Sequence, residues 1–61
     1  MGARWVAMYY EDSADKLPSH TEFFRAETAD EATEIAVRDL NQSPAEKVDI
    51  ALVNVYKTIT K

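Results

Sequence analysis

The fold of this 61-residue chain is decided by the stretch Phe23-Phe24-Arg25-Ala26-Glu27-Thr28-Ala29-Asp30-Glu31-Ala32. Its first half begins with two aromatic residues and is typical of a β-strand. Its second half has the spacing of a capping box, because Thr28 can accept a hydrogen bond from the amide of Glu31 while the Glu31 side chain reaches back to Thr28. The stretch therefore predicts a strand at about residues 22–27 that leads directly into a helix.

The residues after this cap are spaced for one face of a helix, since the apolar side chains recur every three or four positions. They are Ala29, Ala32, Ile35, Ala36 and Leu40. Pro44 disfavours helical backbone at the residue before it, so the helix should have ended by then. We expect a helix at about residues 29–41.

Two further runs are rich in aromatic and β-branched residues and predict strands at about residues 4–11 and 48–60. The element order is then β-β-α-β. The connection through the helix makes the second and third strands parallel, so the first strand fits between them as an antiparallel neighbour of both. We expect a two-layer α+β fold over residues 1–61 as a single domain, with a three-stranded antiparallel sheet in the order 2-1-3 and one helix packed on one face.

The first and third expected strands carry apolar residues on both of their sides. One helix with a narrow stripe of small side chains covers only one side, so the other face of the sheet is left open. Two interpretations stay open. Either a few aromatic side chains are partly exposed, or the open face packs on a second copy of the chain or on another partner.

The net charge of the chain is −4, from 7 Lys and Arg residues and 11 Asp and Glu residues. This balance argues against direct binding of nucleic acid, where clustered Lys and Arg neutralise phosphates. The longest apolar run has six residues, well short of the roughly 20 that span a membrane. Since the N-terminus also lacks the pattern of a signal peptide, we expect a cytoplasmic protein without a membrane contact.

Residues that could carry chemistry are few. The only histidine, His20, follows Ser19, but neighbours in a loop rarely have the orientation that nucleophilic catalysis needs. Glu11, Asp12 and Asp15 lack the ligand spacing and the glycine of a calcium loop. The chain has no cysteine, and its one glycine forms no phosphate-binding loop. We therefore expect no catalytic site, no metal site and no cofactor.

On the expected fold, acidic residues gather at the end that holds the loop between the first two strands and the end of the helix. This acidic end consists of Glu11, Asp12, Asp15, Glu22, Asp39, Glu46 and Asp49. It also holds Lys16, Arg38 and Lys47, which gives it a net charge of −4, whereas the opposite end, with Lys57 and Lys61 among its cations, is neutral. Two interpretations stay open: these carboxylates keep a small protein soluble, or they dock on a basic partner surface.

The stretch of residues 23–32 resembles the middle of a small archaeal-type ribosomal protein with the same β-β-α-β order. Members of that family are basic and bind ribosomal RNA, whereas this chain is acidic. The resemblance therefore implies the fold alone.

The whole chain is similar to the anti-CRISPR proteins of phages and mobile elements in its size, acidity, lack of cysteine and fold type. Many of those proteins block CRISPR effector complexes by occupying surfaces that hold DNA. The similarity implies a non-enzymatic inhibitor or DNA mimic that binds a basic surface of a nucleic-acid-binding complex through its acidic end. The alternative is a small homodimeric structural or regulatory domain that uses its open sheet face.

Overall fold

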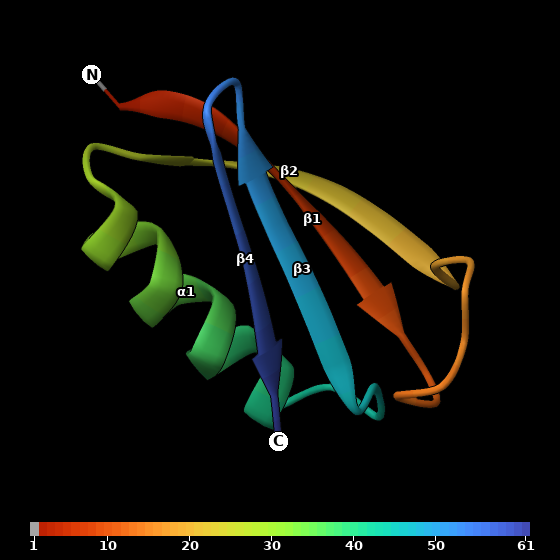
Figure 1. Cartoon of the computed structure of the whole chain (residues 1–61). Coiled ribbons are helices and arrows are strands. Elements are labelled where there is room, and N and C mark those ends of the chain that lie inside the picture. The colour runs from red at the N-terminus through yellow and green to blue at the C-terminus, as the bar shows by residue number, and fades with distance from the viewer. Residues whose placement is uncertain (1) are drawn as a thin grey trace.

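The structure, a computed structural model, describes residues 2–61 (Figure 1). Its elements are β1 (Ala3–Tyr10), β2 (His20–Ala26), α1 (Ala29–Asn41), β3 (Lys47–Leu52) and β4 (Val55–Thr60). The predicted α+β class is confirmed. The first two strands lie where they are expected, with bounds shifted by one or two residues toward the N-terminus.

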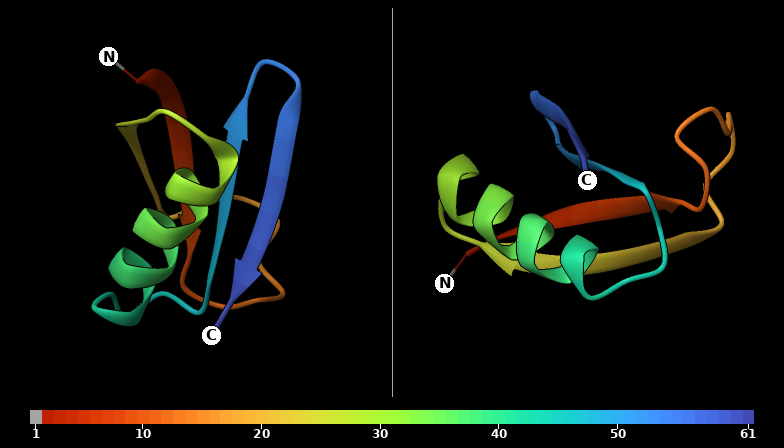
Figure 2. Two further views of the ribbon diagram at one scale, coloured as in Figure 1. Left: turned by 90° about the vertical axis from the view of Figure 1, so that its left-hand side faces the viewer. Right: turned by 90° about the horizontal axis from the view of Figure 1, so that it is seen from below.

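The four strands form one antiparallel sheet in the order β2-β1-β3-β4, so the predicted order of the first three strands is confirmed. The helix α1 connects β2 to β3 and packs on one face of this sheet. Figure 2 shows the helix on one side of the strands only, which leaves the other face of the sheet without a covering layer.

The prediction of one long strand at residues 48–60 is wrong. The chain turns at Val53 and Asn54, and Leu52 pairs with Val55, so this run forms a hairpin of β3 and β4. The sheet therefore has four strands instead of three within the described chain, and β4 becomes an edge strand that runs back toward the end of α1.

The turn also changes which residues share a face, because residues paired across two strands point to the same side of a sheet. Ile59 pairs with Val48, which is in the core, whereas Tyr56 pairs with Ala51. Tyr56 therefore lies on the side of the sheet away from the helix. An uninterrupted strand would have grouped it with Val48.

The helix α1 begins and ends where the sequence predicts. Thr28 is the N-cap, and its side-chain oxygen accepts a hydrogen bond from the amide of Glu31 at 3.1 Å. The Glu31 carboxylate reaches one residue further back than predicted and accepts from the amide of Glu27 at 3.2 Å. No helix within residues 2–61 is long and apolar enough to cross a membrane.

The core lies between α1 and the sheet. The predicted helix stripe is confirmed: Ala32, Ala36 and Leu40 are buried, and Ala29 and Ile35 pack against them. The largest fully buried side chains are Trp5, Leu40, Ile50 and Val48. Five of the eleven buried hydrophobic residues are alanines, so these few large side chains supply most of the buried apolar area.

Candidate functional site

The acidic end forms where the ends of β1, α1 and β4 meet the starts of β2 and β3 (Figure 1). One prediction about its charge is wrong. Because β4 runs back toward this end, Lys61 lies here and not at the opposite end, and its amide donates to the carbonyl of Glu46 at 3.1 Å. The Lys61 ammonium also donates to the Ser43 carbonyl. With this fourth cation against seven carboxylates, the net charge of the acidic end is 4 − 7 = −3.

Three of the predicted site residues hold the loop that connects β1 to β2. Asp12 Oδ1 accepts from the amide of Ala14 at 2.9 Å, and Asp15 Oδ2 accepts from the amide of Asp12 at 3.2 Å. Glu46 Oε1 accepts from the amide of Ser13 at 3.2 Å and so ties the loop to the start of β3. These exposed carboxylates therefore have a local structural role beside any role in binding.

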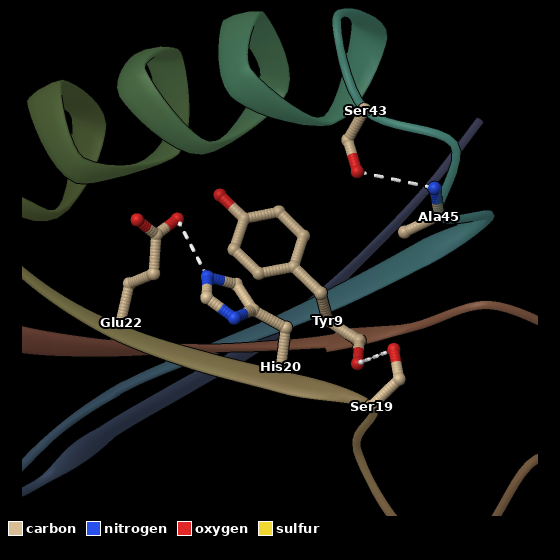
Figure 3. A network of polar contacts seen from close by, with 6 residues as sticks. All are labelled: Tyr9, Ser19, His20, Glu22, Ser43 and Ala45. Atoms are coloured by element: carbon tan, nitrogen blue, oxygen red, sulfur yellow. Dashed lines mark hydrogen bonds and ion pairs between the residues drawn. The ribbon is translucent and has the colours of Figure 1, made fainter.

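A pocket of about 300 Å³ lies at the same end, between the end of α1 and the edge of the sheet at β2. It is lined by Tyr9, Glu11, Ser19, His20, Glu22, Asp39, Ser43, Pro44 and Ala45. We call it the acidic pocket, because three of the seven predicted site residues line it. Figure 3 shows three of the lining side chains, Tyr9, His20 and Glu22, on the side of the sheet that faces α1.

Tyr9 connects the acidic pocket to the core. The residue is only 5 % exposed, and in Figure 3 its hydroxyl is directed toward α1. This hydroxyl has no hydrogen-bond partner among residues 2–61. Burial raises the pKa of the Tyr9 phenol, and the nearby carboxylates of Asp39 and Glu22 raise it further. The hydroxyl is therefore protonated at neutral pH, with one donor and an acceptor oxygen free for a ligand.

His20 and Glu22 form the outer wall of the acidic pocket. They are two residues apart in β2 and so project on the same face. His20 Nε2 lies 3.5 Å from Glu22 Oε1, an ion pair when the histidine is protonated, and the His20 ring centroid is 5.9 Å from that of Tyr9.

The sequence prediction missed Tyr9 and His20 as site residues. It began the second strand at Glu22 and left His20 in a loop, whereas β2 begins at His20, which pairs with Tyr9. The signal was the alternation of strand faces, since counting back two residues from Glu22 places His20 on the same side.

The acidic pocket suits an organic cation. Carboxylates of Glu11, Glu22 and Asp39 surround it, and the negative end of the α1 dipole lies beside it. Arg38 Nε is 3.8 Å from Asp39 Oδ1 and offsets part of this charge. A guanidinium or an ammonium group carries several donors and matches such a set of acceptors. Within residues 2–61 no group of three or more His, Cys, Asp or Glu side chains is placed to hold a metal ion.

Asp49, the seventh predicted site residue, lies apart from the other six on the opposite face of the sheet. It is 5 % exposed, and its Oδ2 accepts a hydrogen bond of 2.6 Å from the Tyr56 hydroxyl. This bond raises the pKa of Tyr56, while burial and then the Asp49 carboxylate raise the pKa of Tyr10. Asp49 Oδ1 has no partner in the described part of the chain.

Comparison of the chain with known protein families, curated proteins and solved structures found no match. The similarity to anti-CRISPR proteins thus stays a prediction from size, charge and fold type. Any function has to be argued from the geometry of the acidic end and of the open sheet face.

Proposed function

We propose that the chain is a non-enzymatic interaction protein whose acidic end binds a basic surface of a partner protein. An arginine or lysine side chain of the partner enters the acidic pocket. The observation that carries this proposal is the pocket itself, in which the hydroxyl of the largely buried Tyr9 lacks a partner within residues 2–61 and three carboxylates line the same space. A guanidinium there donates to the carboxylates while the Tyr9 oxygen accepts one further hydrogen bond.

The remaining acids at this end act at longer range. Asp12, Asp15 and Glu46 are exposed around the loop and add negative potential outside the acidic pocket. Such a charged patch raises the association rate with an oppositely charged surface and makes that rate sensitive to salt. The pocket would then supply the specific contact that follows the encounter.

The partner class that we infer is a nucleic-acid-binding complex, because surfaces that hold DNA or RNA are dense in Lys and Arg. The acidic end then acts as a DNA mimic that occupies such a surface. An inhibitor of a CRISPR effector complex, of the anti-CRISPR type, is the most specific form of this proposal.

The experiment is affinity capture from a lysate of the source organism with immobilised protein, followed by identification of what is retained. The pocket variant combines Glu11→Gln with Glu22→Gln. The control variant combines Asp30→Asn with Glu34→Gln, which removes the same charge from the first turns of α1, at the opposite end of the molecule.

We expect the wild type and the control variant to retain a nucleic-acid-binding complex that excess duplex DNA displaces. The pocket variant should retain it several-fold less, and association with the captured complex should slow steeply as salt increases. Equal retention by the two variants would show that the acidic pocket is not the contact. Retention that DNA leaves unchanged would contradict the DNA-mimic form of the proposal.

A further inference from the structure

The sheet face turned away from α1 is exposed and partly apolar. This open face is centred on a row of residues that pair across the four strands, namely Phe23, Val6, Ala51 and Tyr56. The two aromatic residues of the row are 61 % and 63 % exposed. Val53, which is 92 % exposed, lines a shallow groove beside the row together with Val6 and Ala51.

Two features of the open face carry charge without an opposite charge beside it within residues 2–61, although Arg25 donates to the Gly2 carbonyl at 3.2 Å. Arg4 and Arg25 stand directly opposite each other on β1 and β2, an arrangement of like charges that weakens a sheet. No described carboxylate forms an ion pair with either of them, and the Arg4 guanidinium lies 4.1 Å from the centroid of the Phe23 ring. On the other side of the central row, the buried Asp49 has a carboxylate oxygen without a donor. A buried carboxylate oxygen without a donor lowers the stability of the fold, and a donor from outside the chain would restore that stability.

We propose that the open face packs against the open face of a second copy, about a two-fold axis that runs along the central row. Rotation about this axis brings the row of Arg4 and Arg25 of one copy over the row of Met8 and Asp49 of the other. Stacked sheets lie about 10 Å apart and neighbouring strands about 4.8 Å. Arg4 thus projects over Met8 of the second copy, one strand from Asp49, which a long side chain reaches. Because the axis is two-fold, the contact between Arg4 of one copy and Asp49 of the other forms twice in the dimer.

The size of the molecule permits a specific dimer through the open face. The two largest dimensions of the molecule, 32 and 21 Å, limit the area buried by two such faces to about 1,300 Å² in total, above the roughly 1,000 Å² that specific interfaces need. A 61-residue chain whose core is rich in alanine also gains stability from association.

Single-stranded nucleic acid is the competing occupant, since exposed aromatic rings beside cations are typical of surfaces that stack bases. The open face favours a second copy because it also carries Asp49, whose buried carboxylate repels phosphate and needs a donor. The inference does not depend on the proposed function, because the acidic pocket lies on the side of the sheet that faces α1.

The test is the oligomeric state by analytical ultracentrifugation, at protein concentrations from about 1 to 500 μM, which covers micromolar dimers. The variants are Val53→Asp and Arg4→Glu, and the control is Leu17→Asp in the loop between β1 and β2. Val53 and Leu17 are 92 % and 81 % exposed, so both substitutions place an acid where the fold tolerates it. Circular dichroism checks that each variant is folded.

We expect the wild type and Leu17→Asp to dimerise with equal affinity. Val53→Asp and Arg4→Glu should each weaken the dimer at least tenfold, because Val53→Asp places a new carboxylate opposite Asp49 of the second copy and Arg4→Glu places one a strand away from it. A wild type that stays monomeric at the highest concentration overturns the proposal. So does a dimer that neither variant weakens, or a monomer that binds a fluorescent oligothymidine through this face.

Discussion

The Tyr56→Phe substitution tests how much the buried Asp49 carboxylate depends on its hydrogen bond from Tyr56. The change removes a single oxygen from a largely exposed ring and takes away the donor to Asp49 Oδ2, while the Tyr10 hydroxyl stays beside the carboxylate. The bond of 2.6 Å is in the range of charge-assisted hydrogen bonds, which contribute about 1.5–3 kcal/mol. We expect a loss of about 1.5 kcal/mol, the lower value, because water reaches the exposed Tyr56 side chain.

This loss is a large part of the free energy of unfolding of so small a domain. A 61-residue domain has a free energy of unfolding of about 3–9 kcal/mol by the usual per-residue range. Urea unfolding followed by the fluorescence of Trp5, the only tryptophan, measures the change. A protein concentration of about 1 μM keeps self-association from adding to the stability. Tyr9→Phe is the matched control, since its hydroxyl has no partner within residues 2–61, and should change stability by less than about 0.5 kcal/mol.

A double-mutant cycle with Asp49→Asn separates the bond from other effects of the two substitutions. Side chains in contact show coupling energies of about 0.5–3 kcal/mol, and this pair should give at least about 1 kcal/mol. A coupling below about 0.3 kcal/mol would refute the reasoning, because the Asp49 carboxylate would then be stabilised by something other than Tyr56.

The pKa values of Tyr9 and Tyr56 are raised in the folded state. The contribution of the two protonated phenols to folding stability is therefore fully present below the unfolded pKa of about 10, and it is lost as the pH rises through the folded pKa values. The urea midpoint measured from pH 8 to 11 should therefore fall more steeply for the wild type than for Tyr9→Phe. Leu40→Ala should cost about 2–5 kcal/mol and leave much of the protein unfolded by circular dichroism, whereas Leu17→Ala in the exposed loop should change stability by less than about 0.5 kcal/mol. Thr28→Ala should lower the free energy of unfolding in urea by about 1 kcal/mol, because the N-cap hydrogen bond is lost. Thr28→Ser keeps a hydroxyl at the N-cap and should retain most of the stability.

The helix could be predicted to the residue because its signals are local. Thr28 fixes the first turn through its own side chain, and Pro44 sets a limit on the last turn. The buried stripe follows from spacing alone, since a helix placed on a sheet buries whichever face is apolar. None of these signals depends on parts of the chain that are distant in sequence.

The hairpin of β3 and β4 was missed because its turn lacks the usual sequence signal. Two-residue turns commonly use glycine or asparagine with positive φ, but no residue among those described has positive φ, so Val53 is tolerated in the turn. Length could have revealed the error. A strand over residues 48–60 would be about 43 Å long, far longer than the eight-residue β1 beside it.

The acidic end was predictable because loop and strand ends follow from the element order. The acidic pocket was not, because it depends on the register that pairs Tyr9 with His20 and on how the end of α1 sits over that pair. The burial of Asp49 had a signal, since it alternates with Val48 and Ile50 and therefore faces away from the helix. The donor that it meets there is Tyr56, which only the missed hairpin brings alongside.

The two proposed surfaces together predict a bivalent particle. The two-fold axis along the central row of the open face reverses the strand direction, so the two acidic ends of the dimer lie at opposite ends. A partner with one basic site then binds one copy, with the same affinity for monomer and dimer. An assembly with repeated basic sites binds both copies and gains avidity when the sites match their separation. Val53→Asp should therefore weaken binding to the repeated sites at least tenfold and leave single-site binding unchanged. Equal weakening of both would instead place the open face in contact with the partner itself.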